Sequence, residues 1–169
     1  MASPPEHVQS ATEEAQRLRG WIANGYAQVE YLLGDIVMKS LGMPEYGEIN
    51  GMLPHRPQKR IERVRKILKV NGYFSKFSEE IEWIIAGFEM HHETRNLLAH
   101  GFCTIYHTPN EDVGFEFRKW HRDESNEDTE IRNLFRIVNL EYHKAQLAHI
   151  SERALALSRT IHEELGLVG

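Results

Sequence analysis

The longest periodic segment of the chain is residues 11–41, which read ATEEAQRLRGWIANGYAQVEYLLGDIVMKSL. Apolar side chains recur in it at steps of three and four, at Ala11, Ala15, Leu18, Ile22, Tyr26, Val29, Leu33, Ile36 and Val37. This spacing puts them on one face of an α-helix. Gly42 and Pro44 end the run. The segment therefore predicts one long amphipathic helix with a single buried face.

Three further helices are expected. The second follows Pro57 and carries the stripe Ile61, Val64, Ile67 and Leu68. The third begins at Ser75 or Ser78, either of which suits an N-cap, and continues to Leu98. The last begins near Asn139 and ends before Gly166.

Between the third and last helices the apolar period changes to two. Residues 102–107 are rich in β-forming side chains, residues 108–112 form a turn, and Val113, Phe115 and Phe117 alternate with polar residues or glycine. Residues 123–130 read as an acidic loop, and residues 133–138 as a third short strand. The expected fold is mainly α: a four-helix up-down bundle with a small β hairpin or sheet inserted before the last helix. We expect a disordered lead over residues 1–10 and one domain over residues 11–169.

Composition narrows the class of protein. No apolar run approaches the ~20 residues that cross a bilayer, and the first residues lack a secretory signal, so no membrane partner is expected. The single cysteine, Cys103, fits a reducing cytoplasm. The net charge of −5 argues against nonspecific coating of nucleic acid, although a local basic site remains compatible with it.

One short segment sets charged and titratable side chains into an apolar helix: Arg95-Asn96-Leu97-Leu98-Ala99-His100-Gly101. A guanidinium keeps its charge, whereas an imidazole exchanges a proton near neutral pH. Such a pair can hold a phosphate and move a proton without a metal. Five steps of regular helix separate two side chains by about 140°. Gly101 predicts that the last turn opens and brings His100 toward Arg95.

A polar stripe leads up to this segment. It contains Glu89, His92, Glu93, Asn96 and His100. Because the rest of the helix is apolar, the stripe must face water, a partner or a ligand. Glu89, His92 and Glu93 are therefore candidate supporting residues of the site.

The pattern Arg-Asn-x-x-x-His near the end of the third helix resembles the signature of the HEPN superfamily, the higher eukaryotes and prokaryotes nucleotide-binding domains. Arg95, Asn96 and His100 match that signature. The long first helix and the amphipathic last helix also fit, so the resemblance extends over residues 11–165.

The resemblance implies a metal-independent endoribonuclease that needs no cofactor and acts as a homodimer, with both motifs lining one cleft. His100 would act as general base, or as acid toward the leaving 5′-oxygen. Arg95 would hold the phosphate oxygens, and Asn96 would orient the histidine or donate to the same phosphate. The product would be a 2′,3′-cyclic phosphate. The alternative within the family is a noncatalytic scaffold that binds a nucleotide or a partner protein.

The resemblance also suggests a toxin or defence protein, with an antitoxin or regulatory protein as partner. Some toxins of the family carry a tyrosine two residues after the histidine, and modification of this tyrosine silences them. Phe102 occupies that position and has no hydroxyl group. Control by this route is therefore not expected.

Two plainer interpretations stand beside these. Arg95 and His100 both suit the C-terminal end of a helix, where cations meet unpaired carbonyl groups. The basic residues Lys59, Arg60, Arg63 and Lys66 of the second helix are candidates for RNA binding, but such a run is more often a solvated helix face.

A metal site is not expected, because the histidines lack the i, i+4 spacing of a helical zinc site and Cys103 has no CxxC partner.

Overall fold

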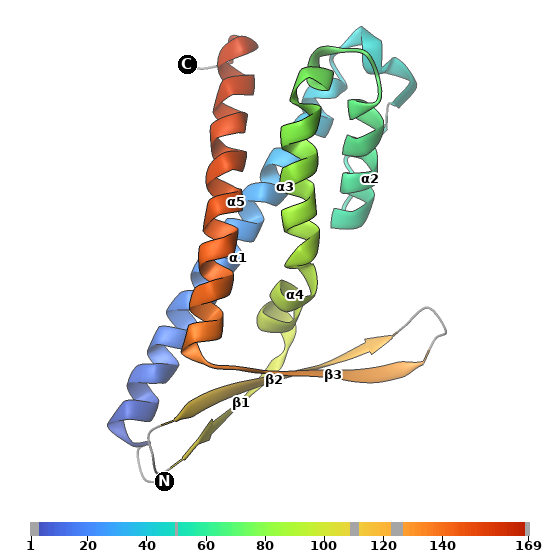
Figure 1. Ribbon diagram of the computed structural model, residues 1–169. Helices are drawn as coiled ribbons and strands as arrows, with labels where there is room; N and C mark the ends of the chain where they lie inside the picture. The colour runs from blue at the N-terminus through green and yellow to red at the C-terminus, as the bar shows by residue number, and fades with distance from the viewer. Residues whose placement is uncertain (1–3, 50, 109–111, 123–126, 168–169) are drawn as a thin grey trace. The chain divides into compact units, whose positions relative to one another are not determined.

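The computed structural model describes residues 4–49, 51–108, 112–122 and 127–167 (Figure 1). Its helices are α1 (Glu6–Ser40), α2 (Pro57–Leu68), α3 (Ser78–Met90), α4 (His92–His100) and α5 (Ile137–Glu164), with 3₁₀ helices at Pro44–Ile49 and Tyr73–Phe77. Strands β1 (Phe102–His107), β2 (Val113–Arg122) and β3 (Asp128–Phe135) lie between α4 and α5 in the chain. The protein is mainly helical with a small antiparallel sheet. Of the helices described, none has both the length and the apolar character to span a membrane.

The expected four-helix bundle is not confirmed, because the third predicted helix is broken. α3 ends at Met90, and α4 begins at His92. Between them His91 has φ −97° and ψ 1°, outside the helical region. The His91 side chain is buried there against His143. The described part of the chain therefore contains five α-helices rather than four.

Two element boundaries also differ from expectation. α1 begins at Glu6, so the second half of the predicted disordered lead is helical, and buried Val8 extends the apolar face; residues 1–3 lie outside the described residues. β3 begins at Asp128, inside the predicted acidic loop, because Arg122 on β2 pairs with Asp128 across the strands. The rest of that loop, residues 123–126, is not described.

α5 starts two residues before its predicted position. The Arg136 N–H donates to Asn139 Oδ1 at 2.8 Å. This contact is one half of a capping box, in which the third helical residue satisfies the N–H of the N-cap. Asn139 therefore lies in the first turn of the helix, although the sequence suggested it as the start.

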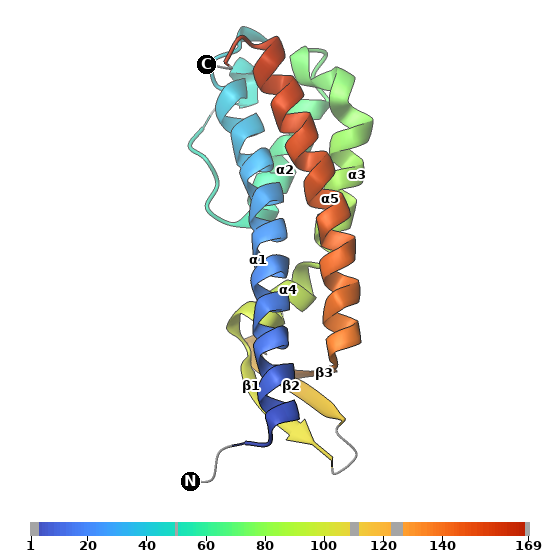
Figure 2. The ribbon, with the colours of Figure 1, turned by 90° about the vertical axis from the view of Figure 1, so that its left-hand side faces the viewer.

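The chain divides into two compact units. The first, which we call the sheet unit, comprises residues 1–24 and 91–148. The second, the helical unit, comprises residues 25–90 and 149–169. α1 and α5 each contribute one part to each unit (Figure 2).

The helical unit has an apolar core made by four helices. The Tyr26 ring of α1 stacks on Phe88 of α3, with centroids 3.8 Å apart. Gly87 of α3 lies against Ile150 of α5, so closely that a Cβ at this position would come within 2.6 Å of the Ile150 Cδ1. The predicted stripe of α2 is fully buried: Ile61, Val64, Ile67 and Leu68. The amphipathic spacing of these helices thus predicts which faces are buried.

The sheet unit is built on the order β1-β2-β3, antiparallel throughout. Phe115, Phe117 and Phe135 are buried on its inner face. This face meets α4 and the first part of α1, since Phe117 lies beside Gly101 and under the Arg19 guanidinium. Because side chains alternate along a strand, Lys119 and His121 continue the inner face of β2 beyond Phe117.

Candidate functional site

α4 carries the predicted motif and is a regular helix to its last residue. Leu97 and Leu98 are buried and fix the helix in the sheet unit. Glu93 in the first turn and His100 in the last suit the helix dipole. The Gly101 N–H donates to the Leu97 carbonyl at 2.7 Å and closes the final turn. The expected opening of this turn at Gly101 is therefore wrong.

A closed last turn separates the two principal side chains of the motif. Five regular steps place Arg95 and His100 about 140° apart around the axis of α4. Arg95 is half-buried, and His100 is exposed. Within one chain, the two groups do not converge on a common point.

The structure instead links Arg95 to His92 through Asn96. Arg95 Nη1 donates to Asn96 Oδ1 at 3.0 Å, and Asn96 Nδ2 lies 2.9 Å from His92 Nε2. Since a guanidinium only donates, the amide must turn its oxygen to Arg95 and its NH₂ to the histidine. His92 Nε2 then accepts, which assigns the neutral ring its proton on Nδ1. Asn96 orients a histidine, as the motif predicted, but that histidine is His92.

Arg95 also lines a hollow of about 210 Å³ in the sheet unit, which we call the arginine hollow. The second arginine on its wall is Arg19 of α1. Arg19 Nε donates to the Leu98 carbonyl at 3.1 Å, and its guanidinium lies 4.9 Å from the centre of the Phe117 ring. Arg19 thus satisfies a carbonyl in the last turn of α4, where helical partners are missing. The other residues lining the arginine hollow are Gln16, Gly20, Ile22, Ala23, Leu98 and Ala99.

The predicted polar stripe is divided between two places. Glu89 belongs to the helical unit, where its two carboxylate oxygens each accept from Arg65 at 3.0 Å. This bidentate pair raises the pKa of Arg65, with hydrogen bonding to Glu89 as the largest cause. His92 and Glu93 instead lie in the sheet unit beside Asn96. Glu89 therefore forms an ion pair with Arg65 and is not a supporting residue of the site around Arg95.

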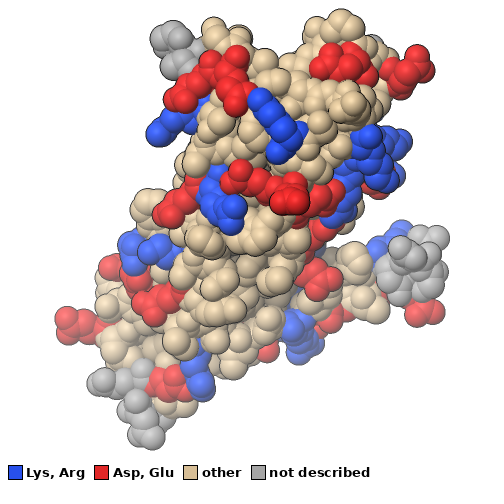
Figure 3. Space-filling model, turned by 45° about the horizontal axis from the view of Figure 1, so that its top comes forward, with Lys and Arg blue, Asp and Glu red and all other residues tan. Residues whose placement is uncertain are grey.

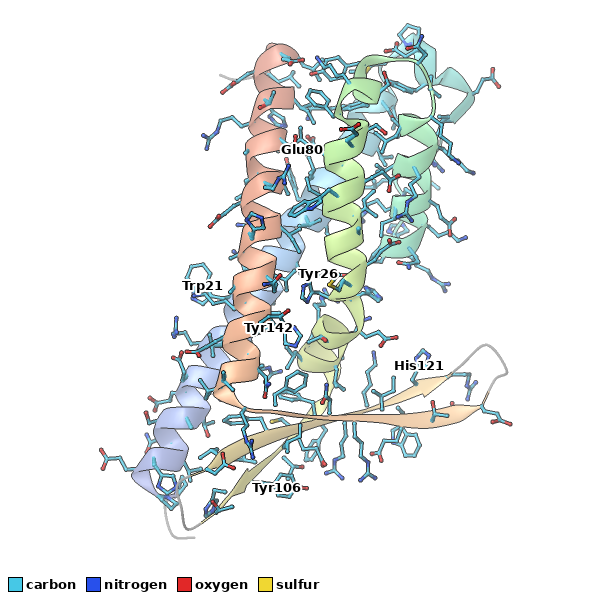
Figure 4. The ribbon with its side chains drawn as sticks, viewed as in Figure 1. Trp21, Tyr26, Glu80, Tyr106, His121 and Tyr142 are labelled. Carbon is cyan, nitrogen blue, oxygen red and sulfur yellow. The ribbon has the colours of Figure 1, made fainter. Side chains whose placement is uncertain are left out.

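The second hollow of the sheet unit lies between α4 and the inner face of β2 and β3, and we call it the α4–β2 hollow. It measures about 190 Å³ and is lined by His92, Glu93, Asn96, Leu97, Lys119, His121 and Ile131. In Figure 4, His121 points to the α4 side of the sheet and Tyr106 to the opposite side. Two histidines, one lysine and one amide therefore meet a single hollow, from a helix and a strand that are far apart in sequence.

The basic residues predicted on α2 have mixed roles. Arg60 donates to the carbonyls of Pro54 and Glu30, and Arg63 donates to that of Ile49. Lys59 pairs with Glu62, 2.9 Å away. Lys59, Arg63 and Lys66 nevertheless line a third hollow of about 410 Å³ in the helical unit. On the face shown in Figure 3, acidic and basic side chains are interspersed rather than gathered in one basic patch.

Sequence reasoning missed Arg19, Lys119 and His121, although each had a signal. Arg19 follows Ala15 by four residues and precedes Ile22 by three, so it lies on the apolar face of α1. Lys119 and His121 continue the two-residue period of Phe115 and Phe117. A charged or titratable side chain on an otherwise buried face is the pattern that all three share.

None of the three hollows offers a metal site, because within the described part of the chain no three His, Cys, Asp or Glu side chains come close enough to bind one ion. The half-buried Cys103 is also a poor nucleophile, because burial raises the pKa of its thiol.

Comparison with protein-family models, with curated proteins and with solved structures gave no match. The resemblance to the HEPN superfamily therefore stays a prediction. What can be said of function follows from the contacts of α4 and the sheet.

Proposed function

We propose that the protein is a metal-independent endoribonuclease of the HEPN type, with Arg95 and His100 as its catalytic residues. The observation that carries this proposal is the arginine hollow, which both Arg95 and Arg19 line. Two permanent cations on one hollow attract a phosphate, and the planar donors of Arg95 suit its oxygens. His100 is exposed at the end of the same helix, where a strand of RNA can reach it.

The proposal includes the bundle architecture that the family would require. It treats α3 and α4 as one bundle helix interrupted at His91, which together with α1, α2 and α5 gives four. The order of these elements supports this, because the motif closes the third helix and the strands come just before the last one.

The chemistry uses the nucleophile that RNA carries. His100 takes the proton of the 2′-hydroxyl, the 2′-oxygen bonds to phosphorus, and the bond from phosphorus to the 5′-oxygen breaks. The leaving 5′-oxygen takes a proton from water, so the products are a 2′,3′-cyclic phosphate and a 5′-hydroxyl end. Arg95 stabilises the charge that develops on the phosphate oxygens.

The proposed site uses two copies of the chain, and the geometry of α4 supports this. Arg95 and His100 lie about 140° apart on one regular helix, so a single protomer does not present both to one phosphate. In a twofold-symmetric homodimer, Arg95 of one protomer and His100 of the other can flank the same phosphate. The proposed site is therefore composite.

The test is cleavage of single-stranded RNA in excess chelator. Arg95→Ala and His100→Ala should each abolish cleavage, while Arg17→Ala, which removes an exposed guanidinium from the same unit, should not. A mixture of the Arg95→Ala and His100→Ala proteins should recover part of the activity, because a mixed dimer has one site with both groups intact. Loss of activity on chelation, or normal cleavage by either alanine variant, would overturn the proposal.

One observation favours the noncatalytic alternative. Asn96 links Arg95 to His92 rather than to His100, and this arrangement suits a site that binds a nucleotide or partner without cutting it. RNA that is bound but left intact at high protein concentration would select this alternative.

A further inference from the structure

Lys119 is the starting point for a second site. It is half-buried on the inner face of β2. Its strand neighbours Arg118 and Arg122 project from the other face, and each meets a carboxylate, Glu116 and Asp128 respectively. Among the described residues, Lys119 forms no ion pair. The hollow that Lys119 borders also carries the Glu93 carboxylate, so Lys119 offers its ammonium as a hydrogen-bond donor to an anion while Glu93 offers acceptor oxygens.

Two histidines border the same hollow as Lys119. His121 follows Lys119 by two residues and therefore projects from the same face of β2. His92 approaches from α4, and its Nε2 accepts from Asn96, which leaves the ring proton on Nδ1. The α4–β2 hollow thus brings together one lysine and two histidines.

The size and the remaining lining of the hollow define the ligand further. At about 190 Å³ it is smaller than the roughly 300–1,000 Å³ of pockets that enclose a whole small molecule. It therefore fits one group of a larger ligand. Glu93 is exposed at this hollow and accepts hydrogen bonds, which suits a sugar hydroxyl or a base amino group. Ile131 and Leu97 supply apolar contact beside it.

We propose that the α4–β2 hollow binds the phosphate group of a nucleotide, with Lys119 and His121 on one side of the phosphate and His92 on the other. Asn96 is a positioning residue that fixes the His92 ring. The site is distinct from the arginine hollow, and it does not depend on whether the protein cleaves RNA.

Binding is tested on the full-length protein by NMR of its histidine side chains, at constant pH and ionic strength. The probes are inorganic phosphate, a nucleoside 5′-monophosphate, and a short oligoribonucleotide without terminal phosphates. We expect the His92 and His121 resonances to shift with a common saturation curve, while those of His149, in the helical unit, stay in place. Binding of the monophosphate identifies a phosphate monoester as the ligand, and binding of the oligoribonucleotide alone identifies an internal phosphodiester.

The charge on Lys119 is tested with matched variants. Lys119→Gln should weaken binding about tenfold, which corresponds to loss of one charge-assisted hydrogen bond. Lys119→Arg keeps the charge and should retain binding, which separates a lost contact from a misfolded protein. Lys144→Gln removes an equal charge from α5, where Lys144 lies over the Trp21 ring, and should have no effect.

Three results would overturn the inference: no shift with any probe, unchanged affinity in Lys119→Gln, or equal weakening by Lys144→Gln. The proposed function is tested separately, because His100→Ala should abolish cleavage and leave binding in the α4–β2 hollow intact. A protein that cuts no RNA but binds phosphate through Lys119 would overturn the proposed function alone.

Discussion

The imidazoles of His91 and His143 face each other with their Nδ1 atoms 3.4 Å apart. His91 is buried at the break between α3 and α4, and His143 lies on α5 within the same sheet unit. Burial lowers the pKa of both rings, and the neighbouring His143 lowers that of His91 further. The pair is therefore neutral in the folded protein at a pH where free histidines begin to protonate.

We expect acid to destabilise the sheet unit through this pair. Because the folded pKa values lie below those of the unfolded chain, the unfolded state binds more protons as the pH falls through about 6.5 and below. The contribution of this pair to the free energy of unfolding is therefore fully present above that pH and is lost progressively below it. His143→Gln, which removes one ring that would protonate, should show a smaller fall in thermal midpoint between pH 7.5 and pH 5.5. An equal fall in both proteins would exclude this pair as the cause.

Arg19 should be important for stability apart from any role in binding. Arg19→Ala leaves the Leu98 carbonyl without its guanidinium donors and removes the contact with Phe117. The expected loss is about 1–3 kcal/mol in the free energy of unfolding, measured by urea titration. Arg17→Ala, two residues earlier on α1, removes only an exposed pair with Glu14 and should leave that free energy unchanged within error. Similar losses in the two variants would contradict a specific role for Arg19.

The apolar pattern of the sequence predicted the buried faces well. Leu18, Ile22 and Tyr26 of the long stripe are each at most 1% exposed. The alternation of Phe115 and Phe117 likewise identified the inner face of the sheet. These features were predictable because they depend on local periodicity, which a helix or strand converts directly into a buried face.

The break at His91 was signalled only in part by the sequence. Apolar residues stop at Met90, and residues 91–96 read HHETRN before Leu97 and Leu98 resume the apolar pattern. Such a gap interrupts the buried face but does not by itself end a helix. The contact that accompanies the break is with His143, which is 52 residues away in the chain. The break thus involves a tertiary contact. The link from Arg95 through Asn96 to His92 is instead local, because its partners are one and four residues apart on α4. The sequence could place these side chains on one helix, but spacing alone did not show which neighbour the Asn96 amide would select.

Gly101 should tolerate no side chain, although its φ of −76° is accessible to any residue. A Cβ there would lie 2.4 Å from the Leu97 carbonyl oxygen, a backbone atom of the closed last turn. Gly101→Ala must therefore shift the junction between α4 and β1, and we expect a cost of about 1–3 kcal/mol by urea titration. Gly20→Ala is the matched control, since a Cβ at Gly20 meets no atom within 4 Å. A Gly101→Ala protein as stable as the wild type would show that the junction between α4 and β1 accommodates a Cβ without cost.

The hydrogen bonds that link Arg95 to His92 through Asn96 should determine which nitrogen of the neutral His92 ring carries the proton. Asn96→Asp keeps an oxygen for Arg95 but replaces the NH₂ group that donates to His92 Nε2 with a second acceptor. His92 Nε2 must then carry a proton in order to donate, so the neutral ring should change from the Nδ1–H to the Nε2–H tautomer. The ¹⁵N chemical shifts of the two ring nitrogens distinguish these forms directly. Asn96→Gln is the control, because it retains both a donor and an acceptor on a longer side chain. Wild-type His92 shifts in Asn96→Asp would mean that the amide does not set the tautomer, and that Arg95 and His92 are uncoupled in solution.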